Sequence, residues 1–167
     1  YRPDEVEIEV NAAGGNPKIV IVGLPDTAVK ESQDRVTTAI INSGYYWPRG
    51  RTTINLAPAD IKKEGPSFDL PIALGMIAAA QEIEEDLFAN FSFVGELALN
   101  GAIRAVKGVL PVALEARRRG KRAIIVPEAN AREAAMVAGI EIYGVENLRQ
   151  AFQFVRGEKQ LQAVPGD

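Results

Sequence analysis

Hydrophobic and polar residues alternate at the beginning of the chain and predict a β-strand there. Val6, Ile8 and Val10 alternate with glutamates, and a period of two is typical of a strand with one solvated face. Residues 18–23, with the sequence KIVIVG, are apolar on both faces and indicate a central strand. A Gly-Gly-Asn-Pro turn separates the two segments. We therefore expect them to pair as an antiparallel hairpin.

Residues 26–43 repeat their apolar side chains with the spacing of an α-helix. Gly44 follows this segment and can serve as its C-terminal cap. Glu31 and Arg35 lie one turn apart on one face, which we expect to be solvated. The opposite face, which we expect to be buried, is formed by Val29, Ser32, Val36, Ala39 and Ile40.

The rest of the chain predicts further strands and helices. Residues 52–58 are rich in β-branched side chains and indicate a strand. Residues 68–81 are apolar nearly all round and predict a deeply buried helix. An Asn-Gly pair at 100–101 lies between two short apolar runs and is a strong hairpin signal. A helix closed by Gly120 follows, and then two strands alternate with two more helices.

This order of elements predicts the fold class and the domain boundaries. The early strands are expected to pair locally, whereas the later strands alternate with helices. We therefore expect an α+β fold in which helices cover a mixed sheet. Residues 1–156 are expected to form one domain, and residues 157–167, which have no periodicity, are interpreted as a linker.

The composition excludes several classes of site. The 167 residues include no cysteine and no histidine, which excludes a Ser-His-Asp triad, a thiol nucleophile and the usual zinc ligands. The formal net charge is −3, so nucleic acid would have to bind a local basic patch. No apolar run has the length of a membrane span and no secretory signal opens the chain. We expect a soluble, cytoplasmic protein without a membrane partner.

Motifs that bind nucleotides or metals are also missing or incomplete. Neither G-x-x-x-x-G-K-[ST] nor G-x-G-x-x-G occurs, so we expect no nucleotide or other cofactor in this segment. Asp60, Glu64 and Asp69 could hold a metal ion in principle. Lys62 and Lys63 lie among them, and we therefore expect no metal site.

Basic residues are concentrated at the end of the helix that Gly120 closes. This basic cluster consists of Arg117, Arg118, Arg119, Lys121 and Arg122. Cations at a helix C-terminus complement the helix dipole, but so dense a cluster also suits a patch that contacts phosphates, which Arg104 and Lys107 could extend. The aromatic residues 45–47 have two interpretations as well. They could be a lid over the core, which we favour, or a platform for stacked bases.

Ser67 lies between a Gly-Pro turn and the start of the apolar helix, where a serine can be a nucleophile or a helix cap. A serine hydroxyl is a poor nucleophile until a base takes its proton, and the chain has no histidine. As an N-cap, Ser67 would accept a hydrogen bond from an early amide, and Asp69 would complement the helix dipole. We expect Ser67 to be such a cap, with a structural role.

Four stretches of the chain resemble one protein family. Their sequences are VGLPDTAVKES, INLAPADIKKEGPSFDLPIALG, FVGELALNGAIRAVKGVLPVALEAR and AIIVPEANAREAAMVAGIEIYGVENL. They resemble the N-terminal domain of the magnesium-chelatase-like AAA+ proteins, the ComM/YifB group. The resemblance implies that an ATPase domain, which would bind ATP and magnesium, lies outside this chain. It further implies a hexameric motor that drives branch migration of DNA in recombination and natural transformation, so the implied partners are DNA and further copies of the protein.

The same type of domain is similar to the proteolytic domain of Lon and the C-terminal domain of RadA. This similarity implies a βαβ crossover of the uncommon left hand. In Lon-type proteases the serine of a Gly-Pro-Ser turn is the nucleophile, and a lysine on a following helix is its base. Ser67 matches the serine, but Leu110 falls at the position of the lysine. Lys107 lies three residues before Leu110. It could serve as the base only if the alignment with the Lon-type proteases shifts.

Three functions are therefore open at this point. The expected one is a non-catalytic assembly and DNA-handling domain. The second is a hydrolase that uses Ser67 and Lys107, and the third is a partner-binding module unrelated to DNA.

Overall fold

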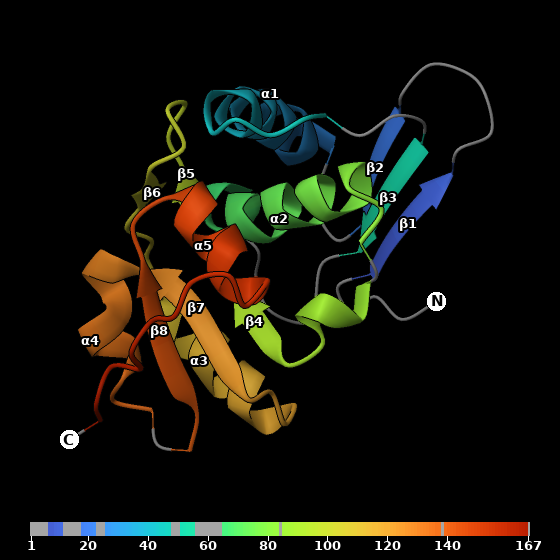
Figure 1. Ribbon diagram of the computed structural model, residues 1–167. Coiled ribbons are helices and arrows are strands. Elements are labelled where there is room, and N and C mark those ends of the chain that lie inside the picture. Colours follow the sequence, from blue (N-terminus) through green and yellow to red (C-terminus); the bar gives the residue numbers. More distant parts are fainter. Residues whose placement is uncertain are drawn as a thin grey trace.

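A helix that is apolar on every side lies at the centre of the fold. In the computed structural model (Figure 1) this helix is α2 (Asp69–Ala80), and all of its residues from Asp69 to Ala79 are buried. The structure describes residues 7–11, 18–22, 26–47, 51–55, 65–83, 85–137 and 139–166. Helices α1 (Asp26–Asn42) and α5 (Leu148–Val155) pack against α2. The prediction of a deeply buried helix is confirmed.

The first sheet contains β1 (Glu7–Asn11), β2 (Lys18–Val22) and β3 (Arg51–Asn55), in the order β1-β3-β2. Strand β3 is antiparallel to β1 and parallel to β2. The expected hairpin of β1 and β2 is therefore wrong, because β3 lies between them. The helix α1 connects β2 to β3, as parallel neighbours require, and the handedness of this crossover stays a prediction.

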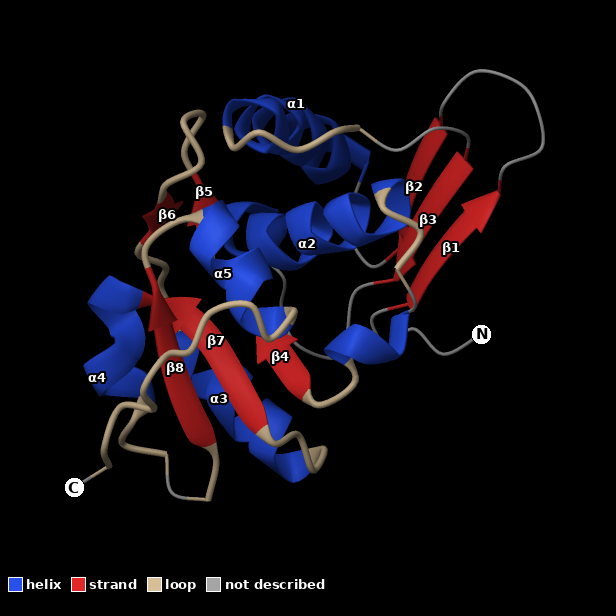
Figure 2. Ribbon diagram, viewed as in Figure 1, coloured by secondary structure: helices blue, strands red, loops and turns tan. Residues whose placement is uncertain are grey.

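The second sheet contains β4 (Phe91–Phe93), β7 (Ala123–Pro127) and β8 (Glu141–Val145), all parallel and in the order β4-β7-β8. Every residue of β7 is buried, as expected for a central strand covered on both faces. One face packs on a hydrophobic cluster that includes residues of α2 and α5. The other face packs on α3 (Val109–Arg118) and α4 (Ala131–Ala134). Figure 2 shows the two sheets on different sides of α2.

A short hairpin connects the second sheet to α3. Its strands are β5 (Glu96–Leu97) and β6 (Ile103–Arg104), which pair antiparallel. The turn contains Gly101 with a φ of 92°, a conformation that glycine adopts without strain. The hairpin predicted from the Asn-Gly pair is confirmed, and the mixture of helices with parallel and antiparallel strands confirms the α+β class.

Two segments without helix or strand also pack on the core. Tyr45 and Trp47 contact the larger hydrophobic cluster, and the Tyr45 ring lies 5.3 Å from that of Phe152. The interpretation of this segment as a lid is confirmed for these two residues, whereas Tyr46 is 84% exposed. After α5, the Val164 N–H donates a hydrogen bond of 2.8 Å to the carbonyl of Ile142 in β8.

Within the described ranges, no helix has both the length and the apolar character to cross a bilayer.

Replacement of Leu74 by alanine should lower the free energy of unfolding by about 2–5 kcal/mol, because Leu74 is only 1% exposed in the middle of α2. The matched change Leu114→Ala removes the same atoms from a side chain on α3 that is 45% exposed. It should cost about 0.5 kcal/mol or less. Chemical denaturation measures both values, and equal losses would contradict the central position of α2.

Candidate functional site

The turn that carries Ser67 is fixed at the carboxyl end of strand β4. Residues Gly65–Phe68 form a 3-10 turn that leads directly into α2. The Gly95 N–H donates to the Ser67 carbonyl at 2.8 Å, and the Leu70 N–H donates to the Gly95 carbonyl at 3.0 Å. A Cβ atom at Gly95 would lie 3.3 Å from Leu70 Cβ, so glycine permits this close approach. Ligand sites in open α/β sheets commonly lie at the carboxyl ends of strands.

Ser67 is not the N-cap of α2, and this expectation is wrong. The N-cap residue is Phe68, which makes no side-chain capping bond. Ser67 lies one residue earlier, in the 3-10 turn, and its side chain is half-buried. The physical reason is tertiary, since the backbone of this turn is held by Gly95 instead of by a local capping hydrogen bond.

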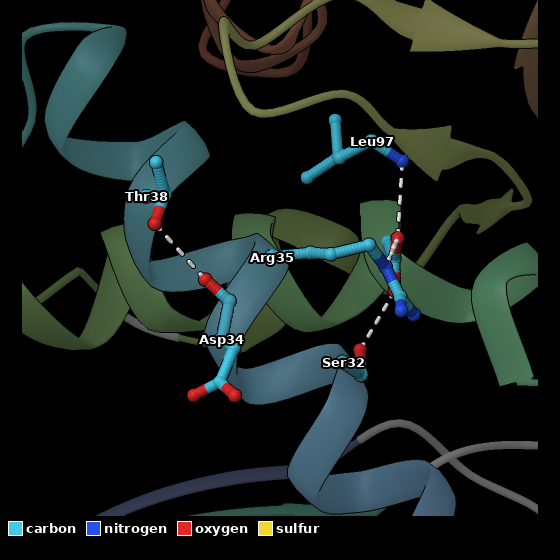
Figure 3. Close-up of polar contacts among 6 residues, drawn as sticks. Ser32, Asp34, Arg35, Thr38 and Leu97 are labelled. Atoms are coloured by element: carbon cyan, nitrogen blue, oxygen red, sulfur yellow. Dashed lines mark hydrogen bonds and ion pairs between the residues drawn. The ribbon is translucent and has the colours of Figure 1, made fainter.

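The Asp69 carboxylate is completely buried and accepts four hydrogen bonds. Oδ1 accepts from Ser32 Oγ at 2.7 Å and from Arg35 Nη2 at 3.0 Å. Oδ2 accepts from Arg35 Nε at 2.9 Å and from the Leu97 backbone N–H at 3.1 Å. Figure 3 shows Ser32, Arg35 and Leu97 converging from α1 and β5. Each carboxylate oxygen thus has two donors, which is what a buried charge requires.

Arg35 was expected on a solvated face, and the structure corrects this. Its side chain is 24% exposed and turns toward Asp69. The hydrogen bond to Asp69 raises the pKa of Arg35 above its usual value, against the opposing effect of partial burial. The expected buried face of α1 is confirmed for Ser32 and for the apolar residues Val36, Ala39 and Ile40.

The oxygens of Asp69 are thus occupied by donors of the protein. Asp60 and Glu64, the other two carboxylates considered as metal ligands, lie outside the described residues. In the sequence, the signal for the hydrogen-bond network of Asp69 was an aspartate in the first turn of an otherwise apolar helix. The sequence contained no signal that Ser32, Arg35 and Leu97 would be the partners of Asp69.

The residues considered as a base for Ser67 lie around the start of α3. Leu110 is in the first turn of this helix and packs against the second hydrophobic cluster. Lys107 is exposed and precedes Gly108, the N-cap residue of α3. Val106, which precedes Lys107, is bound by the side chain of Asn130. Asn130 Oδ1 accepts from the Val106 N–H at 2.9 Å, and Asn130 Nδ2 donates to the Val106 carbonyl at 3.0 Å. Ser67 and Lys107 both belong to the part of the chain that the structure describes, and no hydrogen bond joins their side chains.

The basic cluster lies at the turn between α3 and β7. Gly120 has a φ of 76°, and its N–H donates to the Arg117 carbonyl, as at many helix C-termini. Lys121 Nζ donates to the Ala89 carbonyl at 2.8 Å, and the Arg122 N–H donates to the Asn90 carbonyl at 2.9 Å. These bonds anchor the cluster beside the amino ends of β4 and β7.

Carboxylates lie among the basic side chains. Arg118 donates from Nε to Glu115 at 2.8 Å and makes a second, short hydrogen bond to it from Nη2. The hydrogen bond from Arg118 lowers the pKa of Glu115. The stabilisation from this pair is therefore present above the unfolded pKa and is lost as the pH falls through the lowered folded value. Arg122 Nε lies 3.6 Å from Glu141 Oε2.

The seven basic residues considered for DNA do not form one patch. Arg104 lies on β6, and Lys107 lies just before α3. The basic cluster lies at the other end of this ten-residue helix, about 15 Å away at the usual rise per residue. The structure therefore brings the five residues of the cluster together and leaves Arg104 and Lys107 apart from them.

Comparisons with known proteins agree with the resemblance noted in the sequence. Residues 8–130 match the family described as subunit ChlI of Mg-chelatase. The chain is 44% identical over 156 residues to Competence protein ComM of Haemophilus influenzae, across 93% of this chain and 30% of that protein. It is 43% identical over 157 residues to the uncharacterized protein YifB of Salmonella typhimurium, across 94% of this chain and 31% of that protein. The chain thus spans about a third of the length of these curated relatives.

A more distant similarity links the chain to a protease. It is 27% identical over 161 residues to Lon protease 2 of Bacillus subtilis, across 87% of this chain and 29% of that protein. The expected likeness to Lon is therefore confirmed as a similarity of sequence.

Replacement of Arg35 by methionine should lower the free energy of unfolding by about 3 kcal/mol, because it leaves the buried Asp69 carboxylate without its cation. The matched change Arg118→Met breaks another two-bonded arginine–carboxylate pair, but Arg118 is 67% exposed. It should cost less than about 1 kcal/mol. Urea denaturation of both variants tests the contrast, and a loss for Arg35→Met no larger than for Arg118→Met would show that the Asp69 network adds little.

Proposed function

Because this chain belongs to the family of subunit ChlI of Mg-chelatase, we propose that it is a non-catalytic assembly and DNA-handling domain of a ComM-like hexameric AAA+ motor. The observation that carries this proposal is the 44% identity to Competence protein ComM across 93% of the chain. In this proposal the full-length protein acts in the cytoplasm and drives branch migration of DNA in recombination and natural transformation. ATP and magnesium bind to its ATPase domain, which lies outside the present chain.

The basic cluster supports the DNA-handling part of the proposal. Arg118 and Arg122 are 67% and 70% exposed, so their guanidinium groups can reach phosphates without a change in the fold. Phosphate contacts position a protein on DNA without reading its sequence. A local patch of this kind is what a chain with a net charge of −3 needs in order to bind a polyanion.

The surroundings of Ser67 support the non-catalytic part. A serine nucleophile needs a base within hydrogen-bond reach, and Leu110, at the position of the Lon lysine, cannot accept a proton. Lys107 is exposed and makes no hydrogen bond to Ser67, although both residues are described.

A Ser67–Lys107 hydrolase is the second candidate. It is favoured by the similarity to Lon protease 2 and by the position of the Ser67 turn at the carboxyl end of β4. The third candidate, a partner-binding module unrelated to DNA, predicts no salt-dependent DNA binding and is separated from the first by the following experiment.

The double change Arg118→Gln with Arg122→Gln should weaken binding of this chain to forked or duplex DNA and reduce its salt dependence. If both arginines contact phosphates, the slope of log affinity against log salt should flatten by about 1.4 to 1.8. The matched double change Arg104→Gln with Lys107→Gln also removes two exposed charges, and it should leave the slope unchanged. Fluorescence anisotropy over a salt series measures both. An equal effect of the two double variants would remove the basic cluster as the DNA site.

Ser67 should not react with a fluorophosphonate probe, and Ser67→Ala should leave DNA binding unchanged. The reason is that, among the residues that the structure describes, none accepts a hydrogen bond from the Ser67 hydroxyl group and could take its proton. Mass spectrometry of the intact chain after incubation with the probe measures the reaction. Labelling of Ser67 that disappears in Lys107→Ala would falsify the non-catalytic proposal and establish the hydrolase.

A further inference from the structure

Two arginines of the basic cluster already hold oxyanions that belong to the protein itself. Arg118 donates two hydrogen bonds to the Glu115 carboxylate, from Nε and from Nη2. Arg122 Nε faces Glu141 Oε2 at 3.6 Å. A guanidinium group binds carboxylate and phosphate with the same two-pronged geometry. Glu115 thus occupies the edge of Arg118 that a DNA phosphate would use.

Both carboxylates are less exposed than the arginines that they face, and the difference is larger for Glu115 than for Glu141, which is 46% exposed. The Glu115 side chain is 14% exposed, whereas that of Arg118 is 67% exposed. Glu141 accepts a further hydrogen bond from the Tyr143 hydroxyl at 3.1 Å and is part of strand β8. The exposed guanidinium groups can therefore turn toward an incoming phosphate, while the negative charge of the neighbouring carboxylates repels it.

We propose that Glu115 and Glu141 compete with DNA phosphates for Arg118 and Arg122, and thereby limit the affinity of the basic cluster for DNA. This inference rests on the proposed DNA-handling function. The competition keeps each contact weak, so that the protein holds the DNA backbone and still releases it easily. A contact of this kind suits a domain whose DNA must move past it.

The change Glu115→Gln tests the competition, because it removes the negative charge and keeps the size of the side chain. The dissociation constant for a short labelled duplex should fall about two- to fivefold, as expected when an exposed ion pair no longer has to be broken. Glu141→Gln should act in the same direction. Thermal unfolding of each variant verifies that the fold is retained.

The control Glu31→Gln makes the same chemical change on α1, where Glu31 is exposed. Figure 1 shows α1 and the turn between α3 and β7 on opposite sides of the molecule. Glu31→Gln should leave the dissociation constant unchanged, because charges beyond about 8–10 Å are screened at moderate salt. The gain from Glu115→Gln should also disappear when Arg118 is glutamine.

The outcomes separate this inference from the function on which it rests. If the wild-type chain binds DNA and Glu115→Gln behaves like Glu31→Gln, the competition is refuted and the DNA-handling function stands. The same conclusion holds if the gain from Glu115→Gln persists beside Arg118→Gln. If the wild type, Glu115→Gln and Glu141→Gln all fail to bind DNA, the DNA-handling function is refuted. The proposed competition is then refuted as well.

Discussion

The buried charge of Asp69 constrains the positions of three elements at once. Its carboxylate lies in the first turn of a helix that has no solvated face, and it needs donors on both oxygens. Helix α1 supplies a hydroxyl and a guanidinium group, and β5 supplies the Leu97 N–H. A shift of α1 or β5 would leave part of a buried charge without a hydrogen-bond partner, which is strongly destabilising.

The Ser67 turn is connected to the same network through the residues that follow β4. Gly95 bonds to the backbone of Ser67 and Leu70, and Leu97 bonds to Asp69. The segment from Gly95 to Leu97 is therefore bonded to the beginning of α2 through both of these residues. This arrangement explains why the Ser67 turn is held in place without a side-chain cap.

The two candidate sites lie at opposite ends of the second sheet. The Ser67 turn is at the carboxyl end of β4, and the basic cluster is beside the amino ends of β4 and β7. Helix α3 is the element that the two share, with Leu110 in its first turn and Arg117 and Arg118 in its last turn. The fold thus separates the Ser67 turn from the basic cluster, which we propose as the surface that contacts DNA.

Local signals in the sequence determined the elements and part of the candidate site. The amphipathic face of α1, the wholly apolar α2, the Asn-Gly hairpin and the glycine that closes α3 all depend on residues close to one another in the chain. The five residues of the basic cluster are nearly contiguous, so their proximity also followed from the sequence. The length of α3 could have shown in addition that Lys107 lies at the far end.

Only the tertiary structure decided the strand order and the partners of buried groups. Strand β3 lies between β1 and β2 because pairing across a crossover competes with the nearest hairpin, and neither periodicity nor turn residues measure that competition. Arg35 and Asp69 are 34 positions apart, and Arg35 had an equally plausible neighbour on its own helix. With the same local sequence, a charged side chain on a helix can face water or a distant carboxylate. The packing of α1 on α2 determines that Arg35 faces Asp69.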